Sequence, residues 1–255
     1  MGFTSPLNIP PVNNVRTVSD TKRAFYSTHT RPINSIYRRV VEELMVEMHL
    51  LSVNTDFHYD PIYALGVVTS FDRFMQGYRP ERDREGIFNA LCQSIEADPQ
   101  QYRSDAQRIL DSTRELSDTE ILGVLKRSEG NDRTHELQQL LSEISSNPKF
   151  KYSRLFGIGV FTLLEQTQAN ALKDAKQREE LFSAIAAALN LPEEKIKKDV
   201  ELYQSNLEKM TQARSVMEDI IAADRKKREQ RAQQQKQKDA VATPPSSDDE
   251  GNSES

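Results

Sequence analysis

The stretch TVSDTKRAFYSTHTRPINSIYRRVVEELMVEMHLLS, residues 17–52, decides the fold class of this chain. After Pro32 its apolar side chains recur at steps of three and one, which places them on one face of a helix. Pro32 itself suits the first position of a helix, where its missing N–H costs nothing. We therefore predict a helix from Pro32 to about Val53. Its inward face is Ile33, Ile36, Tyr37, Val40, Val41, Leu44, Met45, Met48 and Leu51, and its solvent face is Arg38, Arg39, Glu42, Glu43 and Glu47.

A second stretch, YDPIYALGVVTSFDRFMQGY at residues 59–78, predicts the helix that packs on the first. Asp60 is a helix N-cap, Pro61 occupies the first helical position, and Gly77 marks the end. Similar start and stop signals recur along the chain, and no convincing strand appears. We predict an all-α, multi-helix globular bundle. Further helices are expected after Ser19 or Asp20, from Pro80, from Asp98-Pro99, behind a Ser117/Glu120 capping box, before Pro148, over 153–168 and over 175–189.

The composition supports a helical protein with an acidic body. Of its 255 residues 29% are charged and only nine are glycine, and the net charge is −5. Charge is unevenly distributed, because residues 225–238 carry +6 and residues 239–255 carry −5. The rest of the chain is mildly acidic, which argues against nucleic acid as the main partner.

Membrane and redox signals are weak. The longest apolar run, Leu155 to Leu164, has about ten residues, whereas a membrane-spanning helix needs roughly 20. The N-terminal segment has neither a hydrophobic signal core nor the composition of a transit peptide. Cys92 is the only cysteine, so an internal disulfide is excluded. We expect a soluble or peripheral protein.

The last predicted helix, opened by Pro192, has a different pattern from the others. Its apolar side chains alternate in steps of four and three from Ile196 to Ile221, and Arg214 occupies one expected apolar position. This is a heptad pattern of about four repeats. Two alternatives stay open: the helix pairs with a partner or a second copy of the chain, or it docks on its own core. The candidate interaction seam is Val200, Tyr203, Leu207, Met210, Met217 and Ile221.

A basic run follows the seam. It has three interpretations: a solvated helix end, a contact with anionic membrane lipid, or a docking strip for an acidic protein. No aromatic side chains interleave to stack RNA bases. The candidate electrostatic strip is Arg225, Lys226, Lys227, Arg228 and Arg231. We predict four segments: a disordered arm at 1–16, a helical domain at 17–190, the heptad helix at 191–224, and a basic extension with an acidic disordered tail at 225–255.

Candidate catalytic and metal sites are weak. His49, Asp56, His58 and Asp60 cluster in sequence but match no zinc spacing, so satisfied or exposed histidines are expected. The Gly157–Gly159 motif lacks a third glycine and a Lys-Ser/Thr pair, and close helix packing explains it better than a phosphate loop. Cys92 is expected to be a small core residue. We predict no catalytic residues, no metal, no cofactor and no enzymatic activity.

The segments KRAFYSTHTRPINSIYRRVVEELMVEMHLL (22–51) and YDPIYALGVVTSFDRFMQGY (59–78) resemble the thylakoid formation protein family of cyanobacteria and plastids. Weaker support comes from YSRLFGIGVFTLLE (152–165). The resemblance implies a non-enzymatic accessory protein for thylakoid biogenesis and photosystem II assembly and repair.

The same resemblance implies partners and a location. Expected partners are FtsH-type membrane proteases and photosystem II assembly intermediates. Without a transit peptide the chain looks cyanobacterial, placed peripherally on the cytoplasmic side of the thylakoid membrane. The alternative is a pigment- or small-molecule-binding helical protein, with the helix around Gly157–Gly159 lining a pocket.

Overall fold

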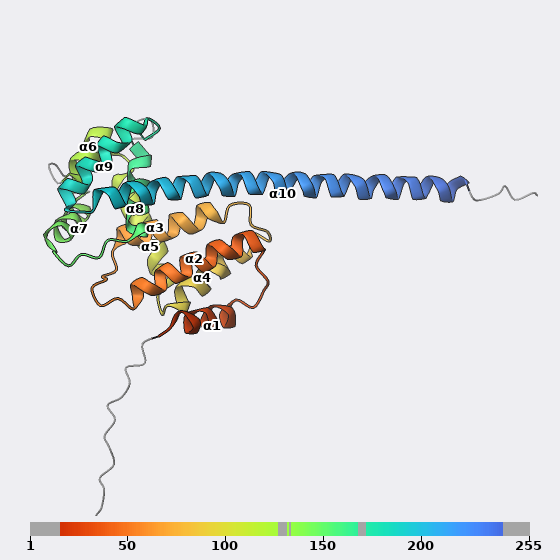
Figure 1. The fold of residues 1–255 in the computed structure, drawn as a ribbon, viewed down its shortest axis with the longest axis horizontal. Helices are drawn as coiled ribbons and strands as arrows, with labels where there is room; N and C mark the ends of the chain where they lie inside the picture. The colour runs from red at the N-terminus through yellow and green to blue at the C-terminus, as the bar shows by residue number, and fades with distance from the viewer. Residues whose placement is uncertain (1–15, 127–131, 133, 168–171, 242–255) are drawn as a thin grey trace, which may run out of the picture. The chain divides into compact units, whose positions relative to one another are not determined.

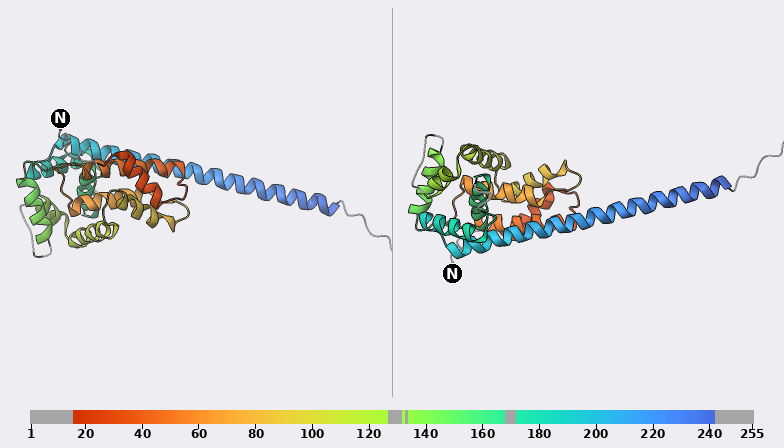
Figure 2. Two further views of the ribbon diagram at one scale, coloured as in Figure 1. Left: turned by 90° about the horizontal axis from the view of Figure 1, so that it is seen from below. Right: turned by 90° about the horizontal axis from the view of Figure 1, so that it is seen from above.

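The computed structural model describes residues 16–126, 132, 134–167 and 172–241. These residues form ten α-helices and no strand (Figures 1 and 2), so the all-α prediction is confirmed. The helices are α1 (Val18–Thr28), α2 (Ser35–Ser52), α3 (Pro61–Phe74), α4 (Asp83–Ser94), α5 (Pro99–Thr113), α6 (Asp118–Leu125), α7 (His135–Ser146), α8 (Arg154–Thr167), α9 (Ala175–Leu189) and α10 (Glu193–Val241).

The starts of α3, α5 and α6 follow the predicted capping signals, whereas α1 begins at Val18 behind a Thr17 cap and α4 begins at Asp83, later than the predicted start at Pro80. Asp60 caps α3 by accepting the Tyr63 amide at 2.8 Å, and Ser117 caps α6 in a capping box with Glu120. The start of α2 differs from the prediction at Pro32. The Asn34 side chain accepts the Ile36 amide at 3.1 Å, so Asn34 is the N-cap and the helix begins at Ser35.

The contacts divide the chain between Leu207 and Glu208 into two units. In unit 1, up to Leu207, the central helix α3 packs against both α8 and α5. Leu44, from the predicted inward face, is buried, and so are Leu65, Phe71 and Phe161. Ile36 and Val40, which were also expected in the core, are only half-buried.

Glycines allow α3 and α8 to approach each other closely. A Cβ on Gly159 would lie 2.0 Å from the carbonyl oxygen of Ile62, and one on Gly66 would lie 1.7 Å from that of Leu155. Backbone atoms cannot yield as a flexible side chain can, so these positions require glycine. The interpretation of Gly159 as a packing residue is confirmed.

The first turns of α10 belong to the core of unit 1. Val200 and Tyr203 are 1% and 2% exposed, and Ile196 is equally buried. The Tyr203 ring packs edge-on against Phe74 and Phe161, with centroids 5.7 and 6.2 Å apart. Of the two alternatives left open for the heptad helix, docking on its own core is the one observed for these three residues. The unit boundary falls after Leu207, whereas the sequence placed it before residue 191.

Unit 2, taken by itself, contains the part of α10 from Glu208 to Val241. A single helix has no core, and Val216, Ile220 and Ile221 are exposed. Within the described residues, no helix is long and apolar enough to cross a membrane. Residues 1–15 of the predicted arm and residues 242–255 of the predicted tail lie outside the described residues.

Candidate functional site: a groove beside α2

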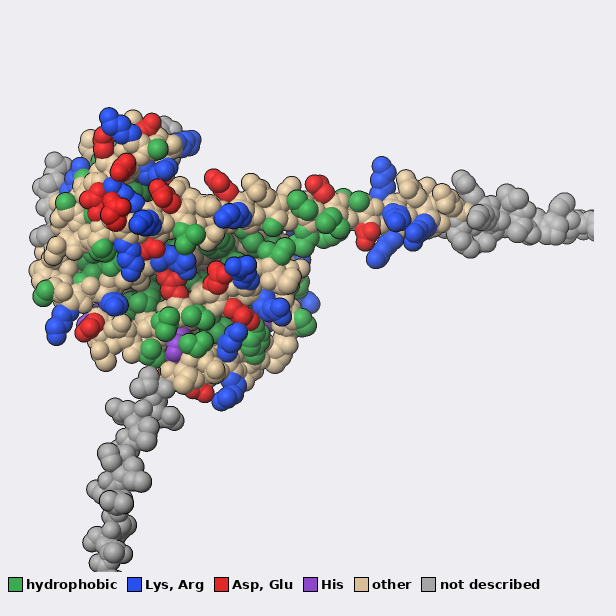
Figure 3. Space-filling view, in the orientation of Figure 1, with side chains coloured by type: hydrophobic (Ala, Val, Ile, Leu, Met, Phe, Trp, Pro, Cys, Tyr) green, Lys and Arg blue, Asp and Glu red, His purple; other side chains and the backbone are tan. Residues whose placement is uncertain are grey.

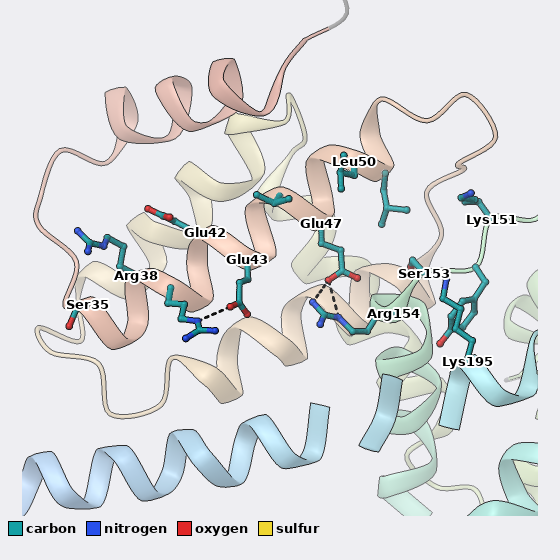
Figure 4. Close-up of a pocket in the computed structure, with 14 residues that line it drawn as sticks. Ser35, Arg38, Glu42, Glu43, Glu47, Leu50, Lys151, Ser153, Arg154 and Lys195 are labelled. Atoms are coloured by element: carbon teal, nitrogen blue, oxygen red, sulfur yellow. Dashed lines mark hydrogen bonds and ion pairs between the residues drawn. The ribbon is translucent and has the colours of Figure 1, made fainter. Parts of the chain in front are cut away.

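An open groove of about 760 Å³ lies on the surface of unit 1. One wall is the outer face of α2, and the other is made by residues 151–154 together with Lys195 in the first turn of α10 (Figure 4). The two walls come from segments far apart in the sequence. The groove is therefore a product of the tertiary fold.

An ion pair between Glu47 and Arg154 ties the two walls together (Figure 4). Arg154 donates from Nε and Nη2 to Glu47 Oε2, at 3.1 and 2.5 Å. Burial raises the pKa of Glu47, and the Arg154 guanidinium and the Leu155 amide oppose that rise. Because α8 begins at Arg154, the carboxylate occupies the positive end of that helix. The prediction that Glu47 faces water is wrong, because its side chain is only 18% exposed and is held by Arg154.

Tyr152 shapes the second wall. Its hydroxyl donates to Asp199 Oδ2 at 3.1 Å, and burial, with Asp199 nearby, raises the pKa of this phenol. The Lys195 ammonium lies 5.2 Å from the Tyr152 ring centroid, within cation–π distance. Gly157 makes room for the phenol, because a Cβ there would lie 2.4 Å from its oxygen. Gly157 and Gly159 are thus both used in packing.

The groove combines an exposed apolar side chain with uncompensated positive charge. Leu50, in the last turn of α2, is 56% exposed at the groove. On the α2 wall, Arg39 pairs with Glu43 at 2.9 Å and Glu42 pairs with Lys22 at 2.9 Å. Lys151 and Lys195, in contrast, form no ion pair with the residues that the structure describes. This arrangement suits a ligand that presents an acidic group beside an apolar one.

The residues predicted as sites lie elsewhere. Of the seam, Val200 and Tyr203 are buried, Leu207, Met210 and Met217 are half-buried, and Ile221 is exposed. The electrostatic strip of Arg225, Lys226, Lys227, Arg228 and Arg231 is exposed in unit 2, where Arg225 pairs with Glu229 at 2.8 Å. None of these residues lines the groove. The sequence signal that could have indicated the groove is that Val46 and Leu50 are apolar yet fall outside the predicted inward face of this helix.

The histidine and cysteine positions serve packing. His49 is buried, and its Nδ1 lies 2.9 Å from the Thr21 hydroxyl, which joins α2 to α1. Cys92 is a buried core residue, as predicted, and burial raises the pKa of its thiol to about 12. Across the described ranges, no group of three or more His, Cys, Asp or Glu side chains could hold a metal ion.

Comparison with known proteins identifies the family. The model of the thylakoid formation protein family matches residues 17–232. The chain belongs to the thylakoid formation protein family. The resemblance seen in the sequence is thereby confirmed, and the family takes part in thylakoid formation.

Relatives within the thylakoid formation family match over nearly their whole length. Protein Thf1 of Nostoc punctiforme is 62% identical over 215 residues, covering 84% of this chain and 92% of the relative. Protein Thf1 of Gloeothece citriformis is 59% identical over 216 residues, covering 84% and 96%. A solved structure of Psb29 superposes with a TM-score of 0.72 at 46% identity, covering 84% of this chain and 98% of that one.

Proposed function

We propose that the groove beside α2 binds a short segment of a membrane-protein partner, and that the chain acts through it as a non-enzymatic accessory protein at the thylakoid. The partners proposed are FtsH-type protease complexes and photosystem II assembly intermediates. The chain would stabilise them from a peripheral position on the cytoplasmic side of the membrane.

The observation that carries this proposal is the exposed Leu50 beside the uncompensated Lys151 and Lys195. An apolar anchor that becomes fully covered supplies most of the affinity of a small interface. The two ammonium groups lie on the rim, so they contribute more to the association rate and to the choice of an acidic segment than to affinity. The Glu47–Arg154 pair holds both walls in place before the partner arrives, which lowers the entropy lost on binding.

A cross-linking pull-down from thylakoid membranes tests the proposal. Leu50→Glu places a charge at the apolar anchor, and it is expected to abolish recovery of protease and photosystem subunits. Leu202→Glu is a matched control, because Leu202 is 45% exposed on α10 and does not line the groove. Both variants are first checked for an unchanged melting temperature.

Equal recovery of the subunits by the Leu50→Glu and Leu202→Glu proteins would contradict the groove as the binding surface. The charge-reversal pair Lys151→Glu and Lys195→Glu sharpens the test. It is expected to slow association and to cost no more stability than the exposed cation–π contact of Lys195, about 0.5–1 kcal/mol, because neither lysine has an ion-pair partner in the described part of the chain. A coloured or other small ligand that co-purifies with the wild-type protein would instead favour a ligand-binding function.

A further inference from the structure

The helix of unit 2 has one apolar face. At about 100° per residue, Val216, Ile220 and Ile221 fall within an arc of about 140°. They are 58%, 60% and 61% exposed. These three large aliphatic side chains lie within two turns and form an exposed apolar patch. Such a patch is typical of an interaction site.

Basic residues lie within the same arc, before and after the apolar residues along the helix. Helical spacing places Lys209 in the arc before the apolar residues, and Lys227, Arg228 and Arg231 in it beyond them. Figure 3 shows the sequence of side-chain types along the outer part of α10, apolar first and then mainly basic. None of these four cations forms an ion pair with a described residue. The face from residue 209 to residue 231 is here named the basic–apolar stripe.

Acidic residues are largely kept off the stripe. Glu218, Asp219 and Glu229 lie on the opposite side of the helix by the same spacing, and Asp224 is the one acid within the arc. A coiled-coil seam would instead carry mixed charges on both of its flanks. Lys226 lies with these acids, but most of the cations share one face and most of the acids share the other, which is typical of a helix that lies in the surface of an anionic membrane.

We propose that the basic–apolar stripe of unit 2 docks on an anionic lipid bilayer. Val216, Ile220 and Ile221 enter the boundary between headgroups and acyl chains, and Lys209, Lys227, Arg228 and Arg231 contact lipid phosphates. The stripe is about 33 Å long at 1.5 Å per residue, and it lies in the plane of the surface. Each of the four cations is attracted to the negative surface potential of such a membrane.

The inference deepens the proposed function and rests on it in one respect, because it names the membrane-contact surface of the same accessory protein. The groove of unit 1 and the stripe of unit 2 share no residue. A vesicle assay contains no protein partner. Its failure would therefore leave the groove standing, and failure of the pull-down would leave the stripe standing.

The chain has no tryptophan, which allows a direct test in the full-length protein. Ile220→Trp puts a single reporter on the stripe, and Ala222→Trp puts a matched reporter on the opposite, exposed side of the same turn. With vesicles that mix phosphatidylglycerol and phosphatidylcholine, we expect a blue shift of the emission at position 220 and none at position 222. Vesicles of phosphatidylcholine alone are expected to give a much smaller shift.

Charge variants provide the second arm. The triple variant K227Q/R228Q/R231Q removes three positive charges from the stripe and is expected to lower vesicle affinity on the order of 100-fold. The control S215E/A222E/Q233E changes the net charge equally on the opposite face, and a much smaller loss is expected. Raising the salt concentration should weaken the wild-type protein far more than the triple variant.

Three results would overturn the proposal. Two of them are the absence of an emission shift at position 220 with anionic vesicles, and an equal shift at positions 220 and 222. The other is a shift at position 220 that requires thylakoid proteins and does not occur with pure lipid, which would assign the stripe to a protein partner.

Discussion

Helix α10 carries one heptad pattern through two different environments. Tyr203 and Ile221 both fit the pattern, yet Tyr203 is 2% exposed and Ile221 is 61% exposed. The difference arises because Phe74 of α3 and Phe161 of α8 surround Tyr203 in unit 1, while unit 2 by itself is a lone helix. Periodicity identifies which side chains share a face, but the residues that cover that face come from distant parts of the chain.

The largest loss of stability is expected from shortening a buried side chain in the first part of this pattern. Tyr203→Ala should lower the free energy of unfolding by about 3–5 kcal/mol, because it removes a fully buried aromatic side chain. Ile221→Ala is the control on the same helix, and its effect should stay within about 0.5 kcal/mol. Urea denaturation followed by circular dichroism measures both. Similar losses of stability for the two variants would contradict the difference in burial between Tyr203 and Ile221.

The second-largest loss of stability is expected where α3 and α8 pack closely. Gly159→Ala should destabilise unit 1 by about 3 kcal/mol, the upper end of the usual cost of overpacking, because the new Cβ meets the Ile62 carbonyl oxygen. Gly86→Ala in α4 is the matched control, since a Cβ there meets nothing within 4 Å. It should stabilise the protein by about 0.5–1 kcal/mol through helix propensity. A Gly159→Ala protein as stable as the wild type would show that α3 and α8 can move apart without loss of stability.

The sequence predicted local structure better than the site. Helix positions follow from capping residues such as Asp60 and Ser117, whose effects act within one turn. The helix start predicted from Pro32 was wrong. A proline is favourable at the first position of a helix but does not make a helix begin there, and in this chain Asn34 supplies the side-chain cap. The groove depends on Glu47 meeting Arg154, and no local rule links residues that far apart.

The buried cap of α3 gives unit 1 a pH dependence. Burial raises the pKa of Asp60 to about 7 from 3.8, although the amides of Tyr63 and Ile62 oppose the rise. The unfolded carboxyl ionises near pH 4 while the folded one resists ionisation until about pH 7. Stability from this group is therefore fully present below pH 4 and is lost as pH rises to 7, by at most about 1.4 kcal/mol per unit.

Asp60→Asn isolates this dependence, because the amide stays neutral and still caps the helix. Relative to the wild type, this variant should gain stability steadily between pH 4 and pH 7. Chemical denaturation at several pH values measures the difference. Parallel stability curves for the two proteins would show that Asp60 does not titrate in this window.

The smallest effect on stability is expected from removing the end of unit 2. Deleting residues 225–255 should leave the unfolding of unit 1 unchanged within about 0.5 kcal/mol, because the described residues 225–234 are exposed. It should nevertheless reduce sedimentation with thylakoids at low ionic strength, and added salt should mimic the deletion, since exposed charges are screened within about 8–10 Å. Equal sedimentation of both proteins at both salt concentrations would remove the basic strip from the mechanism.

Combining the deletion with Leu50→Glu then separates the two surfaces of the molecule. If the groove and the strip act independently, their effects on the free energy of thylakoid binding should add within about 0.5 kcal/mol, as they do for distant sites. If the deletion does not weaken thylakoid binding further in the Leu50→Glu protein, the strip acts only through the partner held in the groove. The double variant therefore decides between two separate contacts and one composite contact, which neither single variant can do.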